Sequence, residues 1–455
     1  MKQVALEKLL RFTKQFIKLR TLGHLRNALK KIHYADIATL LEYLTQQERL
    51  TVVQLFLDNQ DEISHLGEII SEIKPEIAIE ILSPLSQKHI VAILEELSSD
   101  DAASLIPLFN EDIQLEILKK MKHEDSADIQ EQLAYPEESA GRIMSSDYLA
   151  LDETTTAGDA ISAIQLANEE DIDVPFYLYV IDEDERLKGV ISLKQLILIK
   201  PKSKLRDIMT TDIYKVDVFT DQEEVATVVA DYNLLAIPVV DETDRLVGVV
   251  TVDDIIDIIQ EEATEDIYKL AGVTQDYSPE LGLKESLLKR LPWLFISLFT
   301  TSVSAIVVAI FKGTIENIIT LAVLMPIIPA IGGVVGNQTV AIMVREIVLG
   351  NLEWKRSKTI IIKQLIVSIG SGITIGLVGI GGTLIIFKRI DIGLIFGASI
   401  MINLFIATLF GTIIPLFLKK LKLDPALASG MIVTMTTDVM GLLSFLGLAT
   451  IFLIK

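Results

Sequence analysis

The pattern of hydrophobic positions divides the chain near residue 291. Five long apolar runs follow that point, at 292–311, 318–344, 360–387, 392–418 and 426–454. Each run is long enough to cross a bilayer core of about 30 Å, which takes roughly 20 helical residues. Before that point, short apolar groups at helical or strand spacing alternate with many charged residues. The sequence therefore predicts a soluble part followed by five membrane-spanning helices.

Residues 32–135 predict an all-helical domain with weak internal repetition. Four segments place apolar residues at helical intervals after an opening acid: Asp36–Leu44, Glu76–Leu85, Asp101–Phe109 and Asp125–Leu133. Repeats of this length are typical of stacked short helices that form a solenoid, because one repeat alone cannot bury its apolar face. We interpret the opening acids as helix N-caps or first-turn residues.

The N-terminal arm, residues 1–31, is basic. It has nine Lys/Arg against one acid, and its larger apolar residues follow near-helical spacing. The pattern favours an amphipathic helix packed on the next domain, and a helix lying on a membrane surface is the alternative.

A second repeat follows the helical domain. Gly141–Ile161 aligns with Arg206–Ala226, and Tyr179–Ser192 aligns with Pro238–Thr251. Each copy has β-branched strands around an acidic turn, then a glycine and a helix. The pair resembles tandem cystathionine-β-synthase-type (CBS) domains, which often bind adenine nucleotides.

The nucleotide signature of CBS domains is a Ser/Thr and an Asp three residues apart, for phosphate and ribose. The second copy has it as Thr251 and Asp254, whereas the first copy has Ser192 followed by Gln195 where aspartate is expected. One ribose-binding position is lost, so the resemblance leaves open whether the CBS pair binds ATP as a cofactor.

An acidic stripe follows in the segment from Thr251 to Val273. Four acids recur every four residues and share one helical face: Asp253, Asp257, Glu261 and Glu265. Like charges at this spacing weaken a helix by a few tenths of a kcal/mol each. A solvated acidic face is one interpretation. The other is a divalent cation held by oxygen ligands, the kind that hard cations prefer.

Charge is distributed unevenly. Residues 1–291 carry 56 acids against 29 bases, whereas residues 292–455 carry six acids and twelve bases. A soluble part this acidic repels nucleic acid and attracts cations. The sequence has no cysteine, which excludes thiolate metal sites, and its five histidines are scattered without a nucleophile–base pattern. We therefore do not expect an enzyme.

Loop charges predict the orientation in the membrane. With the soluble part in the cytoplasm, ten Lys/Arg flank the spans on the inner side and four on the outer side, as the positive-inside rule requires. We see no N-terminal secretory signal. Five spans then leave the C-terminus outside a multi-pass protein of the cell membrane.

Two features of the spans suggest an ion pathway. Asp438 is the only charged residue of the fifth run, and a lone carboxylate at that depth is expected to face a watery or protein-lined interior. A protonated carboxyl, or a pair with Lys363, is the alternative. In the second run, Met325–Thr339 has two prolines and three glycines, and such backbone is tolerated in a membrane where it lines a cavity or is buried in protein.

The chain resembles the MgtE-type magnesium channels and transporters. The resemblance rests on the domain order and on the motifs EEATEDIYKLAGV, MPIIPAIGGVVGNQ, LDPALASG and MIVTMTTDV. It implies a multidomain protein: a helical domain over 32–135, CBS domains over 136–202 and 203–266, a connecting helix over 267–291 and a five-helix membrane domain over 292–455.

The resemblance also implies how the protein works. A homodimer would hold a largely hydrated Mg²⁺ at Asp438, helped by Asn337 and by backbone oxygens near Gly333 and Thr434. The connecting helix would plug the pore when intracellular Mg²⁺ binds the cytosolic domains. The implied sensor ligands are Glu223, Asp254, Asp257, Glu262, Glu265 and Asp266, with Asp100 or Asp101 of the helical domain.

Two departures from the family pattern keep alternatives open. Val334 follows the glycine pair where the family usually has asparagine, and Met431 stands where proline is common. The first removes one candidate polar pore group, so the same architecture could carry Co²⁺, Ni²⁺ or Mn²⁺ instead, and the second leaves the local bend open. The CBS pair leaves a membrane-bound nucleotide sensor as a third hypothesis.

Overall fold

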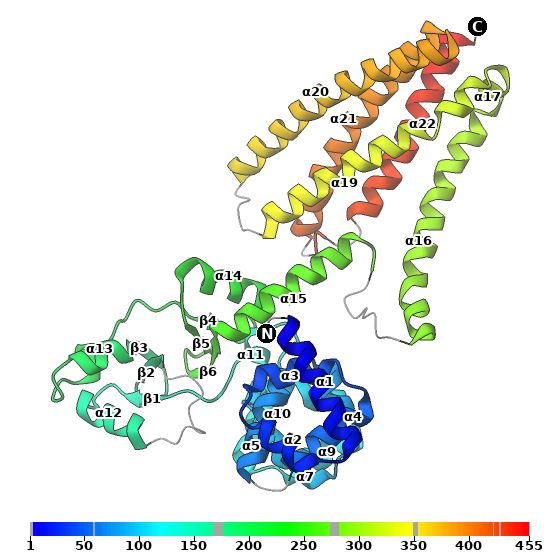
Figure 1. Cartoon of the computed structure of the whole chain (residues 1–455). Coiled ribbons are helices and arrows are strands. Elements are labelled where there is room, and N and C mark those ends of the chain that lie inside the picture. The colour runs from blue at the N-terminus through cyan, green and yellow to red at the C-terminus, as the bar shows by residue number, and fades with distance from the viewer. Residues whose placement is uncertain are drawn as a thin grey trace. The chain divides into compact units, whose positions relative to one another are not determined.

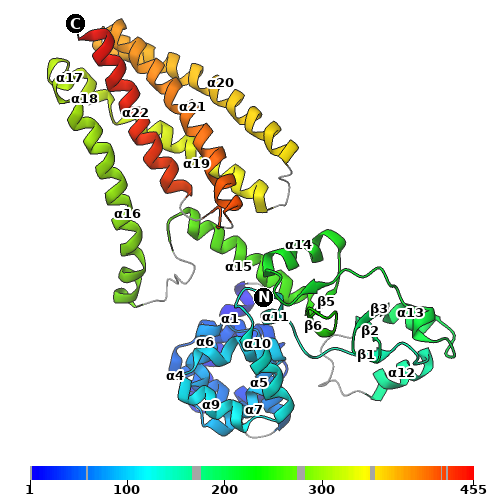
Figure 2. The ribbon, with the colours of Figure 1, turned by 180° about the vertical axis from the view of Figure 1, so that it is seen from behind.

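The computed structural model describes residues 3–57, 60–166, 176–273, 282–348, 354–421, 423–426 and 429–454. By its internal contacts the chain forms two units, Met1–Ile259 and Gln260–Lys455. The first unit contains the helical domain, the CBS pair and the start of a long helix. The second contains the end of that helix and the membrane helices (Figures 1 and 2).

The helical domain is a stack of short helices around one apolar core. They are α1 (Gln3–Leu19), α2 (Leu22–Leu29), α3 (Tyr34–Glu42), α4 (Gln46–Val53), α5 (Gln60–Ser71), α6 (Pro75–Leu82), α7 (Gln87–Leu94), α8 (Ser99–Leu105), α9 (Glu111–Lys120) and α10 (His123–Ala134), with 3-10 turns at Gln54–Phe56 and Ile106–Leu108. The opening acids of the four repeats all lie in first turns, as predicted. Helix α1 packs Phe16 and Ile17 against the core, so the arm is part of this domain.

The CBS pair consists of two small sheets with the same topology. The first has β1 (Ala150–Asp152), β2 (Tyr177–Ile181) and β3 (Leu187–Ser192), and the second has β4 (Val216–Asp217), β5 (Ala236–Val240) and β6 (Leu246–Thr251). In each, the first pair of strands is parallel and the second antiparallel. The helices are α11 (Ala140–Ile143), α12 (Ala157–Leu166), α13 (Leu193–Leu198) and α14 (Gln222–Tyr232), with a 3-10 turn at Leu205–Asp207.

The two copies exchange their leading segments. Met144 precedes the first copy but lies against Gly248 of β6, where an added Cβ would overlap its side chain. Met209 precedes the second copy and lies against Gly189 of β3 in the same way. Two backbone hydrogen bonds reinforce the exchange: the Ser145 amide donates to the Val249 carbonyl (2.7 Å), and the Val249 amide donates to the Ser145 carbonyl (3.0 Å). Each copy is therefore completed by residues that the repeat pattern assigns to the other.

One helix, α15 (Val252–Leu270), leaves the second CBS sheet. It ends at a glycine C-cap: Gly272 has φ +69°, and the Val273 amide donates to the Tyr268 carbonyl at 2.9 Å. The next helix begins at Leu283. The connecting helix that the sequence analysis placed over 267–291 is therefore not a single helix, because glycine ends the first one, and residues 274–281 lie outside the described residues.

The membrane unit has the five predicted spans. The helices are α16 (Leu283–Ile310), α17 (Lys312–Asn317), α18 (Thr320–Leu324), α19 (Ile327–Val348), α20 (Trp354–Phe387), α21 (Ile390–Lys420) and α22 (Ser429–Leu453), with α18 and α19 forming the second span. Helix α21 lies centrally among α19, α20 and α22 (Figure 1). The second span breaks at Met325-Pro326, because a proline there cannot continue the hydrogen-bond ladder.

The residues of α15 that belong to this unit lie at one end of the bundle. Both views place them where α21 ends and α22 begins, at the opposite end from α17 and the C-terminus (Figures 1 and 2). Leu270 packs against a buried cluster there, formed by Val340, Val344, Ala426 and Val433.

Candidate ion pathway and cation sensor

The four predicted pore residues lie on two neighbouring helices, α19 and α22. Gly333 and Asn337 are one turn apart on α19, and Thr434 and Asp438 are one turn apart on α22. The helices run antiparallel: a Cβ added at Gly430 would lie 3.2 Å from the Asn337 Oδ1 atom, and one added at Gly332 would lie 3.2 Å from Thr437. This pairing brings Asp438 to the level of Gly332 and Gly333.

Asp438 is half-buried and stands apart from other charges. Among the residues that the structure describes, no salt bridge involves Asp438, and the exposed Lys363 on α20 does not pair with it. Thr434 directs its hydroxyl to the Gly430 carbonyl at 2.8 Å. Carboxylate, amide and backbone oxygens are the ligand types that suit a hard cation or its water shell.

A charged cluster lies where the end of α15 meets the membrane helices. Lys269 bridges Glu265 and Asp424, with 2.5 Å between its Nζ atom and the Asp424 Oδ2 atom. Glu265 is buried, and its Lys269 partner is mostly enclosed. Gly272 and Leu270 lie against Met431 and Gly430 at the start of α22. The end of α15 therefore touches the segment that leads to Thr434 and Asp438.

Burial perturbs the titratable groups of this cluster. Burial, and then the nearby charge of Asp424, raise the pKa of Asp266 above its usual value. Burial alone would lower the pKa of Lys269, but hydrogen bonds to Asp424 and Glu265 reverse the direction and raise it. Sequence reasoning did not select Asp424 or Lys269 as site residues, although Asp424 opens the quoted motif LDPALASG.

A second acidic site joins α8 to the second CBS domain. Burial, then the charges of Asp254 and Asp101, raise the pKa of Asp100 well above its usual value. Its Oδ1 atom is enclosed and has no hydrogen-bond partner within the described ranges. The neighbouring Ser99 hydroxyl accepts hydrogen bonds from the Ser146 amide (2.9 Å) and from Gln132 (2.8 Å). Two carboxylates with an unsatisfied buried oxygen fit a cation that would neutralise them.

The other predicted sensor residues are spread out. Glu223 lies in the first turn of α14, and Glu262 lies in α15. Asp257 is exposed, and its pKa is raised by partial burial and then by Asp253. In the described part of the chain, no three His, Asp or Glu side chains come together in a group able to hold a metal. The acidic stripe is thus solvated at Asp257 and buried only at Glu265.

The possible nucleotide positions are engaged by the protein itself. In the first copy, Gln195 Nε2 donates to the Ile208 carbonyl at 2.6 Å. In the second copy, the Thr251 hydroxyl donates to Asp254. The cavity beside Thr251, lined also by Tyr177 and Ala236, measures about 10 Å³, about enough for one water molecule. The side chains at these two positions are therefore held by hydrogen bonds within the protein.

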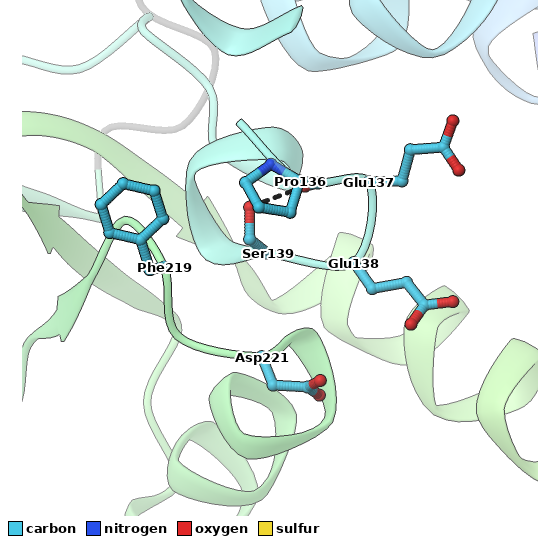
Figure 3. A pocket seen from close by; sticks show the side chains of 6 residues that line it. All are labelled: Pro136, Glu137, Glu138, Ser139, Phe219 and Asp221. Carbon is cyan, nitrogen blue, oxygen red and sulfur yellow. Dashed lines mark hydrogen bonds between the residues drawn. The ribbon is translucent and has the colours of Figure 1, made fainter. Parts of the chain in front are cut away.

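A wider cavity of about 440 Å³ opens beside α14 (Figure 3). The ring of Phe219 lies on one side, and the carboxylates of Glu137, Glu138 and Asp221 lie on the other. Ser139 donates to the Pro136 carbonyl at 2.7 Å. None of the predicted site residues lines this cavity.

The fold and the acidic sites define a class of protein. Five membrane-spanning helices, with a carboxylate inside one of them, follow a helical domain and a CBS pair. Family models match the same three parts: a divalent cation transporter domain over 325–448, the MgtE intracellular N domain over 32–138, and CBS domains over 140–201 and 205–261. The chain belongs to the MgtE family.

Individual relatives support the assignment of the chain to this family. The magnesium transporter MgtE of Bacillus subtilis (strain 168) is 31% identical over 430 residues, 94% of each chain. The magnesium transporter MgtE of Thermus thermophilus is 33% identical over 435 residues, 94% of this chain and 95% of the relative.

Two solved structures resemble the soluble part. One is the soluble part of a magnesium transporter (27% identity, TM-score 0.51), which covers 57% of this chain and 99% of that one. The other is the cytosolic domain of the Mg²⁺ channel MgtE in complex with ATP (33% identity, TM-score 0.50), which covers 54% of this chain and 98% of that one.

Proposed function

We propose that this chain is a Mg²⁺-selective channel for passive influx. It works as a homodimer in the cell membrane, with its soluble domains in the cytoplasm and its C-terminus outside. The observation that carries the proposal is the half-buried Asp438 of α22, which has no ion-pair partner among the described residues. A carboxylate at membrane depth is costly unless it meets a cation or water.

The chemistry of Mg²⁺ suits this arrangement. The ion releases its water reluctantly, so the Asp438 charge attracts a hydrated ion while Asn337 and nearby backbone oxygens bind its water shell. A dication that enters a cell with an inside-negative potential moves down that potential and is stabilised by roughly 4.6 kcal/mol per 100 mV, twice the single-charge value. Influx therefore needs no coupled fuel, but it does need a means of closure.

We assign closure of the channel to the binding of Mg²⁺ by the cytosolic domains. A cation between Asp100 and Asp254 relieves the repulsion of two partly buried carboxylates, and α15 begins beside that site. The far end of the same helix contacts Gly430 and Met431 at the start of α22. Bound Mg²⁺ thus favours the arrangement in which the end of α15 obstructs the path to Asp438. When Mg²⁺ is scarce, the acidic residues repel and the obstruction is released.

The decisive experiment measures Mg²⁺ flux into liposomes that hold the purified full chain, with internal Mg²⁺ varied. Wild type should conduct at low internal Mg²⁺ and close as it rises, and Asp438→Ala should abolish conduction. Glu316→Ala is the matched control, because Glu316 is an exposed acid of α17. Undiminished flux through Asp438→Ala would overturn the proposal.

The same liposomes separate the remaining hypotheses. The departure from the family pattern at Val334, which is 59% exposed on α19 beside Gly333, bears on ion selectivity. Flux is therefore also measured with Co²⁺, Ni²⁺ and Mn²⁺, and a preference for one of these would reassign the transported ion. A nucleotide sensor would keep ATP binding in Asp438→Ala and show no flux in wild type. The family relatives are named as transporters, which supports a transport function and not an enzymatic one.

A further inference from the structure

A buried amide sits where three membrane helices meet. Asn403 of α21 is fully enclosed. Its Nδ2 atom donates to the Ile328 carbonyl in the first turn of α19, at 2.9 Å. Its Oδ1 atom is also enclosed and has no hydrogen-bond partner among the residues described. Neither the predicted pore residues nor the proposed gate uses this side chain.

Two glycines make room for the amide. A Cβ added at Gly332 of α19 would overlap the Asn403 Nδ2 atom, and one added at Gly441 of α22 would lie 2.7 Å from it. The flat amide is therefore held between the backbones of two helices. Small residues allow such close approach between membrane helices, and a polar side chain there adds an interhelical hydrogen bond.

The position of this contact relates it to the proposed ion pathway. Gly332 directly precedes Gly333, and Gly441 follows Asp438 by almost one helical turn. Ile328 lies just after the Met325-Pro326 break, where α19 has lost part of its own hydrogen-bond ladder. The amide thus ties the buried start of α19 to α21 and lies between α19 and α22.

We propose that Asn403 is a positioning residue for the ion pathway, which fixes α19 against α22 so that Asn337 and Asp438 face the same opening. The proposal rests on the proposed function for its transport consequence, but the helix spacing is independent of it. An unpaired buried acceptor costs stability, and an apolar side chain would avoid that cost. The benefit of asparagine is therefore geometric.

Steric compensation tests the contact. Gly332→Ala should lower Mg²⁺ flux about tenfold, since the added methyl meets Asn403. Combining it with Asn403→Ala, which removes the obstructing amide, should restore most of the maximal flux, while the external Mg²⁺ concentration for half-maximal influx stays raised because the hydrogen bond to Ile328 is lost. Gly370→Ala on α20 is the matched control, because a Cβ there meets nothing within 4 Å. A double variant no better than Gly332→Ala alone would overturn the proposal.

A second readout separates positioning from simple stability. Asn403→Leu keeps the number of side-chain heavy atoms and loses the hydrogen bond, which for interhelical bonds corresponds to about three- to tenfold in an equilibrium. We expect the external Mg²⁺ concentration for half-maximal influx to rise by that factor and the preference for Mg²⁺ over Co²⁺ to fall. Unchanged values for both would contradict the proposal even if the protein were less stable.

Cross-linking reports the geometry without transport. The chain has no cysteine, and a Cβ at Gly336 would overlap the Val433 side chain across α19 and α22. The Gly336→Cys/Val433→Cys pair should therefore oxidise readily, and more slowly when Asn403→Leu is added. If this slowing occurs in a protein that carries no Mg²⁺, the proposed function fails and the positioning role stands. If wild type conducts Mg²⁺ but oxidation is unaffected, the positioning role fails alone.

Discussion

Asp100→Asn is expected to strengthen the contact between α8 and the second CBS domain when Mg²⁺ is absent. The charge of Asp100 is opposed by burial, by Asp254 and by Asp101. Like charges close enough to shift each other's pKa, within about 4–6 Å, repel by roughly 3–4 kcal/mol at an effective dielectric constant of about 20. Because Asp100 is only partly buried, we expect the substitution to recover about 2 kcal/mol of stability.

The pH dependence of wild type should follow from the same charge. The raised pKa of Asp100 means that the folded state binds its proton more tightly than the unfolded state does. Its contribution to stability is therefore present at acid pH and is lost as the pH rises through the folded pKa. Without Mg²⁺, wild type should become more stable as the pH falls below neutral. Asp100→Asn should lose this dependence of stability on pH.

Thermal unfolding of the full chain in detergent, without and with Mg²⁺, measures both effects. Mg²⁺ should stabilise wild type, as any ligand of the folded state does, and should stabilise Asp100→Asn by about 2 kcal/mol less. Asp112→Asn is the control, because Asp112 is an exposed first-turn acid of α9. An Asp100→Asn variant that is less stable, or that keeps the full response to Mg²⁺, would refute the reasoning.

Three further substitutions probe other contacts. Asp424→Asn removes one partner of the mostly enclosed Lys269 and should weaken docking of the α15 end by about 1 kcal/mol, so closure in the liposome assay should need about fivefold more internal Mg²⁺; an unchanged closing curve would contradict this. Gln195→Asp restores the aspartate of the CBS signature in place of a glutamine that donates to a backbone carbonyl. Calorimetry should detect tighter ATP binding than in wild type; equal binding would show that another residue determines the affinity for ATP. Gly248→Ala drives a methyl into Met144 and should destabilise the CBS pair by about 1–3 kcal/mol in urea unfolding; an unchanged midpoint would count against the exchanged packing.

Local pattern was sufficient for the elements of this protein. The five spans and the short helices with acids in their first turns follow from the spacing of apolar residues, which depends on neighbours a few positions away. The CBS pair was visible as an internal repeat that resembles this domain family. The lone Asp438 was also visible, because one charge in a long apolar run is unusual. The end of the connecting helix was not anticipated, although Gly272 was there to indicate it.

The tertiary structure decided how residues distant in the sequence meet. It exchanges Met144 and Met209 between the CBS copies, which no repeat alignment could indicate because both copies look complete by themselves. It buries Glu265 against Lys269 and Asp424 while the rest of the acidic stripe stays solvated. It also seats Asn403 between two glycines of other helices. Such contacts depend on the three-dimensional packing of several elements, whereas periodicity records only which face of one element is apolar.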